Sequence, residues 1–571
     1  MYATVILLSG YKLIFNGIKN IFKLNFEEDT LMTIAMVAAF SLREFPESCM
    51  VILLYRLGEF LQDKAVDNSN KNIKSIVEIK AKTANVIKDG KEIVTDVEKV
   101  EVGQTILIKP GEMVPLDCKI IKGMSNLDMS SITGESIPVA VKEDENILSG
   151  SINLNGSLEC IVKKDYKNST ASKIADLVYE ATNNKGKTEE FITKFSKIYT
   201  PTVIIFAILI AIIPPIVLNQ EFKTWIMRAL VFLVASCPCS IVISVPLAFF
   251  SCIGAISKKG MIIKGTKHIE DLANAKYVAF DKTGTITTGK MQVDKLVSRG
   301  NYTDDELLKY VYALERNSNH PISTAIKQKI EDEALNVEYS VNKFEEIAGY
   351  GIKAIVEEKE ITFGNSKLLE LNNIDEEIRT GEGIERNASY IIIDGKLEGY
   401  VTFKEEIREN TVSTIRKLKS TNIDEVVMLT GDNEDNAKNI ANKVGIEKIY
   451  SALLPQDKLE KVKELKQNGK VIFIGDGIND SPVLAEANFG ISMGEAAEIA
   501  ANSADGILLS NNMASLPKAI IIARKCMRIV KENIAISLIA KVIVLALGIL
   551  GIAPVWMAVV ADTGIALLTV L

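Results

Sequence analysis

The chain has 571 residues, of which 47% are hydrophobic and 24% are charged, and its formal net charge is −7. A positive mean hydropathy of +0.17 beside so many charges indicates membrane segments combined with polar soluble parts. The acidic balance excludes a nucleic acid as the main partner, because binding its phosphates requires a basic surface.

The N-terminal run MYATVILLSGY lacks the basic start and the cleavage pattern of a signal peptide, and it is short for a complete membrane span. We therefore expect it to be the end of a helix that begins before this sequence. The seven cysteines are too sparse for a secreted disulfide framework, which favours a reducing cytoplasm for the soluble parts. They are Cys49, Cys118, Cys160, Cys237, Cys239, Cys252 and Cys526.

Apolar segments predict about six membrane crossings besides the partial one at the N-terminus, because the last segment is long enough to cross twice. Two crossings separate the two large polar inserts, so both inserts must lie on one side of the membrane. Lysines that flank the spans on that side indicate the cytoplasm. The apolar segments are at about 31–42, 46–61, 201–218, 224–256 and 534–571, and the inserts cover roughly 64–195 and 258–530.

The first insert contains short β-type runs, such as TANVIK and LECIVKK, separated by Gly, Pro and Asp, which predicts a small β-rich domain. In the second insert, the runs KYVAFDKTGT, EVVMLTGD and KVIFIGDGIND alternate with helical stretches, which predicts a parallel doubly wound sheet. Residues 290–398 interrupt this pattern, so we expect an inserted domain there. We expect membrane segments at 1–63, 196–257 and 531–571, and the β-rich domain at 64–195. The parallel sheet is expected from 258–289 together with 399–530, and the inserted domain at 290–398.

Four carboxylates, Asp281, Asp432, Asp476 and Asp480, follow the predicted strands of the second insert. Ligands of open α/β sheets gather at the carboxyl ends of the strands, so we expect these side chains to converge. Crowded carboxylates repel one another unless a hard cation lies between them, which implies Mg²⁺. The simpler alternative is that each Asp caps the helix that follows it.

Five motifs in this order resemble those of the P-type ATPases over essentially the whole chain: TGES (133–136), DKTGTIT (281–287), TGD (430–432), PQDK (455–458) and GDGIND (475–480). The resemblance implies a multidomain membrane protein. It would combine an α-helical transmembrane bundle, a β-rich actuator domain, a haloacid-dehalogenase-like α/β phosphorylation domain and an inserted α+β nucleotide-binding domain.

The resemblance also implies the catalytic residues. Asp281 would attack the γ-phosphate of ATP to form an aspartyl phosphate, and Lys458 and Thr430 would steady the transferring group. Glu135 would position the water that later hydrolyses this phosphate. The remaining catalytic positions implied are Lys282, Thr283, Gly431 and Asp432, and the Mg²⁺ ligands implied are Asp281, Thr283, Asp476 and Asp480.

A membrane-bound phosphatase of the haloacid-dehalogenase group is a competing interpretation. Such phosphatases usually carry a general acid two positions after the nucleophile, where this chain has Thr283. A threonine cannot donate a proton as a carboxylic acid does, so we expect the phosphoenzyme to persist.

Glu315, His320, Gly349 and Gly351 resemble the adenine site of heavy-metal P-type pumps, which implies that the inserted domain binds ATP. A single histidine is ordinarily a residue without a special task, and a lone G-x-G is weak evidence. The chain has no Walker A motif, so it gives no support for a P-loop.

The sequence SCPCS places Cys237 and Cys239 on either side of Pro238 within an apolar span. Proline removes a backbone donor, and irregular backbone at membrane depth is tolerated around a buried ion. Two thiolates would be soft ligands that favour Zn²⁺ or Cu⁺ over Na⁺ or Ca²⁺. The alternative is that these cysteines are small apolar residues. A C-P-C in this helix also resembles the heavy-metal branch.

Lys541 and Asp562 are the charges of the last 38 residues. They lie 11 residues before and 10 residues after Ile552, where we place the turn, so both fall about 15 Å from it and are level with each other. Asp562 could bind the ion beside the two thiolates, and Lys541 would be a counter-charge that competes with the ion. These positions resemble the zinc, cadmium and lead branch, whereas a Cu⁺ exporter is the alternative.

Glu47 lies near the outer connection of two spans, where it could receive a departing cation, and Glu44 is close enough to share this role. The motifs together predict ATP-driven export of Zn²⁺, Cd²⁺ or Pb²⁺, with Mg²⁺ as cofactor. We expect a monomer in a lipid bilayer, most simply a prokaryotic plasma membrane, with the large domains in the cytoplasm.

Overall fold

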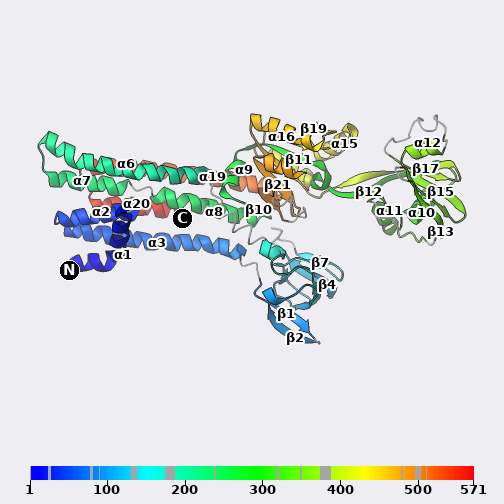
Figure 1. Cartoon of the computed structure of the whole chain (residues 1–571), viewed down its shortest axis with the longest axis horizontal. Coiled ribbons are helices and arrows are strands. Elements are labelled where there is room, and N and C mark those ends of the chain that lie inside the picture. The colour runs from blue at the N-terminus through cyan, green and yellow to red at the C-terminus, as the bar shows by residue number, and fades with distance from the viewer. Residues whose placement is uncertain are drawn as a thin grey trace.

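In the computed structural model the molecule is elongated, with apolar helices at one end and three polar domains towards the other (Figure 1). Both polar inserts therefore lie at the same end of the helices. The structure describes residues 2–22, 28–77, 81–88, 90–129, 138–173, 187–236, 239–316, 321–337, 339–347, 350–372, 374, 388–476, 480–494, 503–509 and 511–570.

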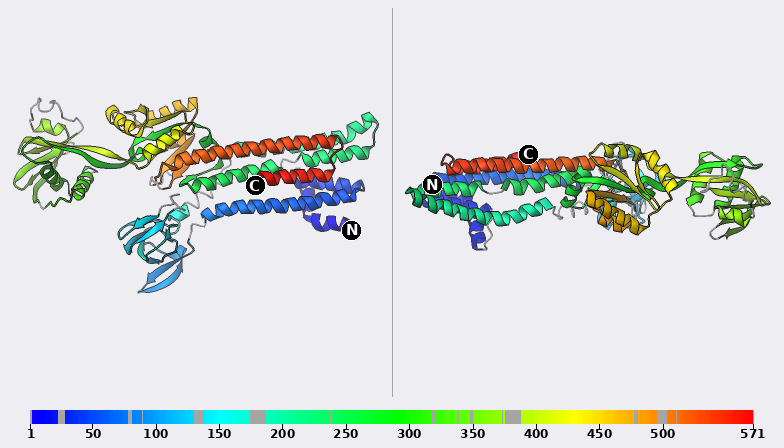
Figure 2. Two further views of the ribbon diagram at one scale, coloured as in Figure 1. Left: turned by 180° about the vertical axis from the view of Figure 1, so that it is seen from behind. Right: turned by 90° about the horizontal axis from the view of Figure 1, so that it is seen from above.

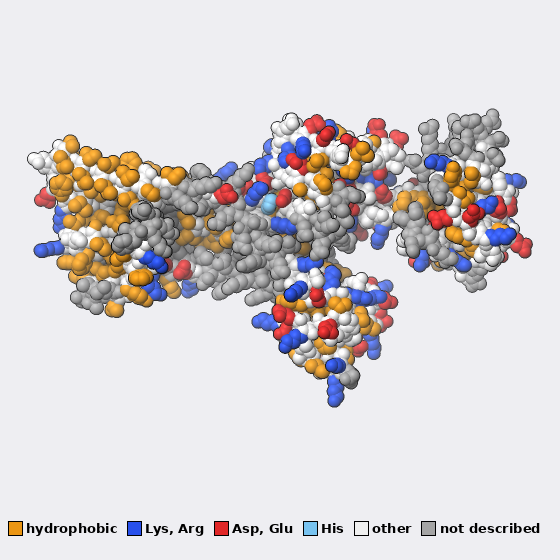
Figure 3. All heavy atoms as spheres, viewed as in Figure 1, with side chains coloured by type: hydrophobic (Ala, Val, Ile, Leu, Met, Phe, Trp, Pro, Cys, Tyr) orange, Lys and Arg blue, Asp and Glu red, His pale blue; other side chains and the backbone are white. Residues whose placement is uncertain are grey.

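Long apolar helices form the membrane end. By length and composition, three described stretches could each cross a membrane, namely 198–218, 222–257 and 515–549, and 30–41 and 555–570 are shorter apolar helices. Hydrophobic side chains make up much of the face of this end that Figure 3 shows. The helices are α1 (Tyr2–Phe22), α2 (Glu28–Ser41), α3 (Phe45–Val77), α6 (Lys187–Leu218), α7 (Phe222–Ala235), α8 (Cys239–Ser257), α19 (Ser515–Ile549) and α20 (Val555–Val570).

The span from 222 to 257 consists of two helices, because α7 ends at Ala235 and α8 begins at Cys239. This break falls at the S-C-P-C sequence, where the sequence predicts a disturbed helix. Pro238 itself lies outside the described residues, as does Cys237.

The first insert forms a β-rich domain of two antiparallel sheets, with strand orders β2-β1-β3-β9-β4-β7 and β6-β5-β8. Alternate residues of its strands point inward, and Ile106, Leu127 and Leu158 are fully buried in its core. The strands are β1 (Thr83–Lys88), β2 (Lys91–Asp96), β3 (Thr105–Ile108), β4 (Cys118–Lys122), β5 (Ser125–Asp128), β6 (Val139–Val141), β7 (Asn146–Ile147), β8 (Ile152–Asn153) and β9 (Leu158–Val162), with a 3-10 turn at Val97–Lys99.

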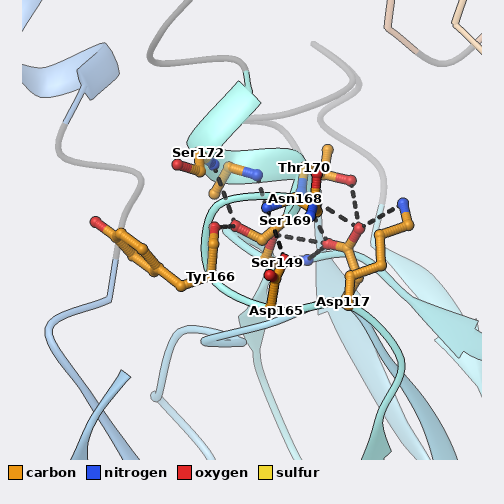
Figure 4. A network of polar contacts seen from close by, with 10 residues as sticks. Asp117, Ser149, Asp165, Tyr166, Asn168, Ser169, Thr170 and Ser172 are labelled. Atoms are coloured by element: carbon orange, nitrogen blue, oxygen red, sulfur yellow. Dashed lines mark hydrogen bonds and ion pairs between the residues drawn. The ribbon is translucent and has the colours of Figure 1, made fainter. Parts of the chain in front are cut away.

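A polar network around Asp117 closes the β-rich domain where the chain leaves it (Figure 4). The buried Asp117 carboxylate accepts hydrogen bonds from the backbone N–H and hydroxyl of both Ser149 and Thr170, and it forms an ion pair with Lys164 at 2.9 Å. Ser149 Oγ in turn accepts the Ala171 amide at 2.9 Å. One carboxylate thus joins the start of β4, the β7–β8 turn and the segment that leads towards α6.

The second insert forms a seven-stranded sheet with the order β10-β22-β21-β20-β11-β18-β19, parallel except for the pairing of β10 with β22. The predicted doubly wound sheet is therefore confirmed. The strands are β10 (Met261–Ile263), β11 (Ala275–Asp281), β18 (Glu425–Leu429), β19 (Lys448–Tyr450), β20 (Lys470–Gly475), β21 (Phe489–Met493) and β22 (Gly506–Leu508). The helices of this parallel-sheet domain are α9 (Thr266–Ala273), α14 (Thr411–Lys419), α15 (Glu434–Val444), α16 (Pro455–Asn468) and α17 (Ser481–Glu486).

The inserted domain has a six-stranded antiparallel sheet with the order β12-β17-β16-β15-β14-β13. Two long strands, β12 (Thr287–Ser298) and β17 (Lys396–Ile407), pair with each other and connect this domain to the parallel-sheet domain (Figure 1). The other elements are α10 (Asp304–Glu315), α11 (Pro321–Asp332), β13 (Val341–Ile347), β14 (Gly351–Val356), β15 (Lys359–Gly364), α12 (Lys367–Leu371) and β16 (Ser389–Ile393).

Helix α19 belongs to both ends of the molecule, because it runs without interruption from the parallel-sheet domain into the apolar helices (Figure 2). Its first turns carry Leu516 and Ile520, which are fully buried in the same hydrophobic core as Phe280 of β11 and Phe249 of α8. Burial of each such side chain contributes about 1.5–3 kcal/mol. The sheet and two membrane helices therefore share one core.

Candidate catalytic and ion-binding sites

Three carboxylates meet at the carboxyl end of the parallel sheet. Asp281 ends β11, and Asp476 and Asp480 follow the neighbouring strand β20. One oxygen of each carboxylate lies within 4.8 Å of the others, and Asp281 and Asp480 are buried. Such a set of oxygen donors fits Mg²⁺, which is usually bound by carboxylates together with phosphate oxygens. The sequence predicted these three residues as ligands.

Lys458, near the start of α16, points its ammonium between two of these acids. Its Nζ lies 2.5 Å from Asp281 and 3.0 Å from Asp480. Burial and the negative charge of Asp480 raise the pKa of Asp281 to about 7, although Lys458 opposes the shift. A bound cation would favour the ionised form of Asp281 in the same way as Lys458 does.

The loop after Asp281 approaches Asp476 more closely than any side chain would allow. Gly284 has φ +70°, and a Cβ built on it would lie 1.6 Å from Asp476 Oδ2. Glycine is therefore required at this position both by the backbone conformation and by space. Thr283, one residue earlier, has an extended backbone and is exposed, two residues after Asp281.

Lys282 is buried and binds two acids from different parts of the chain. Its Nζ lies 2.5 Å from Asp432 Oδ2 and also contacts Glu405 of β17. Burial alone would lower the pKa of Lys282, but the hydrogen bonds to Asp432 and Glu405 raise it, so the ammonium stays charged. Asp432, which we expected among the converging carboxylates, therefore pairs with Lys282 and is not a member of the three-carboxylate group.

Sequence reasoning missed Glu405 and Arg408. Glu405 also accepts a hydrogen bond from Thr287 Oγ1 at 2.6 Å, and Arg408 Nη2 donates to the Gly284 carbonyl at 2.8 Å. Their partners, Thr287 and Gly284, lie in or beside the DKTGT loop. The sequence TFKEEIREN carried this signal, as a cluster of charges at and just after the end of β17.

The TGD loop lies directly beside Asp281. In the pairing of β11 with β18, Asp281 is opposite Leu429, so Thr430 follows one residue further along the same edge. Thr430 is buried, and its Oγ1 accepts the backbone N–H of Asp432 at 3.1 Å across Gly431. This turn aims the Asp432 carboxylate at Lys282.

The candidate nucleotide residues are described only in part. Glu315 is buried at the C-terminal end of α10, and its carbonyl accepts a hydrogen bond from Ser323 at 2.7 Å. Gly351 begins β14 opposite Gly364 of β15. His320 and Gly349 lie outside the described residues, and so does Glu135 of the TGES motif.

Lys541 of α19 and Asp562 of α20 form a buried ion pair between the last two helices. Nζ and Oδ1 are 2.6 Å apart, and the two side chains are 8% and 7% exposed. The sequence predicted that these residues are level with each other. Lys541 also donates to the Ala235 carbonyl at 3.3 Å, at the last residue of α7.

The residues that flank the C-P-C sequence contact α19 close to this pair. Ala235 binds Lys541, and on the other side Ser240 of α8 donates a hydrogen bond to Ser537 of α19 at 3.0 Å. Ser537 lies one helical turn before Lys541. The positions of the Cys237 and Cys239 thiols are outside the described part of the chain, but both neighbours lie beside the buried pair.

Glu47 lies in the first turn of α3 and accepts the backbone N–H of Val555, the first residue of α20. Its Oε2 is buried without a hydrogen-bond partner. Glu44, the second acid in this region, instead forms an ion pair with Lys223 at 2.7 Å. Glu47 therefore has a buried oxygen that could contact a cation.

Models of known protein families match parts of both polar inserts. A P-type ATPase actuator domain model matches residues 78–179, and models of haloacid dehalogenase-like hydrolases match residues 275–488 and 457–520. The first match contains the β-rich domain, and the second begins at the strand that carries Asp281.

Several characterised proteins are similar over nearly the whole chain. A cadmium, zinc and cobalt-transporting ATPase of Bacillus subtilis (strain 168) is 40% identical over 99% of this chain and 81% of its own length. A zinc-transporting ATPase of Synechocystis sp. is 39% identical over 99% of this chain and 78% of its own length. The crystal structure of a zinc-transporting PIB-type ATPase in the E2.Pi state has a TM-score of 0.64 and 28% identity, covering 100% of this chain and 93% of that one.

Proposed function

The chain belongs to the heavy-metal-transporting P-type ATPases, and we propose that it couples ATP hydrolysis to the export of Zn²⁺ or Cd²⁺ across a membrane. The observation that carries the cargo assignment is the buried Lys541–Asp562 pair beside the residues that flank the C-P-C sequence. Cadmium and zinc are both named for the Bacillus subtilis relative.

The geometry at the end of β11 supports phosphoryl transfer to Asp281. An oxygen of Asp281 attacks the γ-phosphorus of ATP, the bond from that phosphorus to the bridging oxygen of ADP breaks, and ADP leaves. Lys458 lies against the attacking carboxylate and stabilises negative charge there. Mg²⁺ would be held by Asp281, Asp476 and Asp480, with Thr283 beside them, and would neutralise charge on the phosphoryl oxygens.

The aspartyl phosphate is then hydrolysed by water, which returns Asp281 and releases inorganic phosphate. We assign the positioning of this water to Glu135 of the β-rich domain. Because that residue belongs to a separate domain, hydrolysis waits for a domain movement, which suits a pump. We assign ATP binding in the inserted domain to Glu315, His320, Gly349 and Gly351.

The ion site combines two thiolates, Cys237 and Cys239, with the Asp562 carboxylate. Mixed sulfur and oxygen ligands suit a borderline divalent ion better than Cu⁺. The Lys541 ammonium occupies the position beside Asp562 in this structure, so it competes with the ion. Glu47, with one free buried oxygen, would receive the ion on its way out.

The three polar domains lie at one end of the helices, and we propose that this end faces the cytoplasm (Figure 1). The lysines that flank the spans on that side support this orientation. We propose that the protein acts as a monomer in a lipid bilayer, most simply a prokaryotic plasma membrane.

The test is a metal panel on the purified chain in lipid vesicles, with ATP hydrolysis and metal uptake measured for Zn²⁺, Cd²⁺, Pb²⁺ and Cu⁺ separately. We expect Zn²⁺ or Cd²⁺ to stimulate hydrolysis and to accumulate in inside-out vesicles. Stimulation by Cu⁺ alone would contradict the cargo assignment. Phosphatase activity that no ion changes, with no acid-stable phosphoenzyme, would contradict the pump.

A further inference from the structure

Arg524 of α19 binds four backbone carbonyls of the parallel-sheet domain. Its Nε donates to Ala273 O at 3.0 Å, and Nη2 donates to Ala275 O at 3.2 Å and to Asn422 O at 3.4 Å. Its Nη1 donates to Thr421 O. One side chain of a membrane helix is therefore fixed by the sheet domain from two sides.

The four carbonyls belong to two connections that feed neighbouring strands. Ala273 and Ala275 connect α9 to β11, and Thr421 and Asn422 connect α14 to β18. Strands β11 and β18 are adjacent and parallel. Their opposite, carboxyl ends carry the nucleophile Asp281 and the TGD loop. Arg524 thus connects the amino ends of β11 and β18, whose carboxyl ends carry the proposed catalytic residues.

The chemistry of the site requires a guanidinium. Its five N–H donors form a rigid planar fork, which a lysine ammonium cannot reproduce. One of the acceptors, Ala273, is the last residue of α9, where helix carbonyls lack partners and carry partial negative charge. Asn422 adopts φ +57°, a left-handed conformation that asparagine tolerates, and this turn presents two successive carbonyls to one guanidinium.

The same helix carries the ion-site lysine. Arg524 and Lys541 are 17 residues apart on α19, a distance of about 25 Å along the axis. The intervening sequence contains neither proline nor glycine, so the helix has no ordinary site for a kink between them. A displacement of the helix at Lys541 is therefore transmitted as a displacement at Arg524.

We propose that Arg524 is a positioning residue that couples occupancy of the ion site to phosphorylation of Asp281. This inference rests on the proposed function, because it assumes that the chain transports a metal ion. Arg524 touches neither ATP nor the ion, and it acts by fixing α19 to the amino ends of β11 and β18.

The apolar contacts of α19 should survive the loss of Arg524. Leu516, Ile520 and Ala523 are buried in the shared core and do not depend on the guanidinium. A variant without it should therefore fold and keep its catalytic site, but the helix would no longer set the position of the two strands. The expected defect is a loss of coupling.

The test compares Arg524→Gln and Arg524→Lys with Lys525→Gln and Arg528→Gln, which change exposed cations of the same helix. The readout is the ratio of acid-stable phosphoenzyme formed from ATP with and without Zn²⁺, together with labelling by inorganic phosphate without metal. Couplings between sites are typically a factor of about 5 to 150, so we expect Arg524→Gln to lower the ratio about tenfold. The ratio for Arg524→Lys should lie between those of Arg524→Gln and the wild type. Both control variants should have the wild-type ratio, and labelling by inorganic phosphate should be like the wild type in all four variants.

Three outcomes would overturn the inference: an unchanged ratio in Arg524→Gln, an unchanged ratio in Arg524→Lys where the glutamine variant fails to fold, or an equal loss in Arg528→Gln. Loss of labelling by inorganic phosphate as well would indicate a damaged catalytic site, which also contradicts a coupling role. Absence of zinc-dependent phosphoenzyme in the wild type would instead refute the proposed function, so the two failures are distinguishable.

Discussion

Two lysines of the catalytic loops have different tasks because their partners differ. Lys458 lies between Asp281 and Asp480, where a transferred phosphoryl group would arrive. Lys282 is buried between Asp432 and Glu405 and ties the nucleophile loop to the TGD loop and to β17. Lys458 would therefore contact the transferred phosphoryl group. Lys282 would instead hold the loops around Asp281 in position.

Gly284 provides a sharp test of this geometry. We expect Gly284→Ala to reduce phosphoenzyme formation at least about tenfold, because the new Cβ would displace Asp476 from the carboxylate cluster. The measurement is phosphoenzyme yield as a function of Mg²⁺ concentration. The matched control is Gly289→Ala, which has nearly the same φ of +72° but no atom within 4 Å of the new Cβ. Both variants carry a backbone penalty of about 1–2 kcal/mol, so equal loss in the two would show that strain and not collision is responsible.

The sequence predicted single catalytic residues better than their partners. Asp281, Asp476 and Asp480 were predictable because each follows a buried strand, and parallel strands place such residues at one edge. The pairing of Lys282 with Glu405 was not predictable, because Glu405 lies 123 residues away on a strand outside the recognised motifs. Pairing across such a separation depends on the register of β12 with β17, which local patterns do not determine.

At the scale of elements, the Asp117 network holds the exit segment of the β-rich domain. Burial acts to raise the pKa of Asp117, but hydrogen bonds from Ser149 and Thr170 and the charge of Lys164 outweigh it and lower the pKa. A lowered carboxyl pKa contributes stability that is present above the unfolded value near 4 and is lost as the pH falls through the folded value. The segment 166–173 should therefore loosen on acidification below about pH 4.

We expect Asp117→Asn to remove this stabilisation at neutral pH, at a cost of at least about 2 kcal/mol, since buried charged hydrogen bonds are lost. Hydrogen exchange of the Thr170 and Ala171 amides measures the effect. The control is Asp144→Asn, which breaks an exposed ion pair with Lys119 in the same domain. Protection that is the same in Asp117→Asn and wild type between pH 3 and pH 7 would refute the role of the network.

The Lys541–Asp562 pair connects the last two helices and makes a second prediction at this scale. Lys541→Met leaves the Asp562 charge buried without its partner, which costs about 3–5 kcal/mol. We expect the melting temperature to fall in metal-free buffer and to recover with Zn²⁺, because the ion takes the place of the ammonium. Thermal unfolding in detergent with and without Zn²⁺ measures both effects.

The exposed Lys531 of the same helix supplies the control, since Lys531→Met removes a charge that has no buried partner. It should change neither the melting temperature nor its response to Zn²⁺. If Zn²⁺ stabilised both variants equally, or failed to rescue Lys541→Met, Asp562 would not be part of the ion site.

Pairing of these two helices was predictable from the sequence, because two charges in an apolar hairpin at equal distances from the turn have strong reason to meet. The contacts of Ala235 and Ser240 with α19 were not predictable. They depend on how α7 and α8 pack against a helix some 300 residues later, and a uniformly apolar segment carries little information about its neighbours.

At the scale of the whole molecule, one hydrophobic core connects the domain that carries Asp281 to two membrane helices. The core that surrounds β11 includes residues of α8, which begins at Cys239, and of α19, which carries Lys541 further along the chain. The sequence predicted the separate domains and their chemistry. It did not predict that α19 continues for 35 residues through both regions, because its polar first half and apolar second half look like different segments.

The measurement that tests the account most directly is the metal dependence of phosphorylation at Asp281 in the wild type and in Asp562→Asn. We predict that γ-labelled ATP forms an acid-stable phosphoenzyme in the wild type when Zn²⁺ is present. In Asp562→Asn this zinc-dependent labelling should be lost, whereas labelling by inorganic phosphate in the absence of metal should remain. Labelling by ATP that is equal with and without Zn²⁺, or that Asp562→Asn leaves unchanged, would contradict the coupling between the two sites.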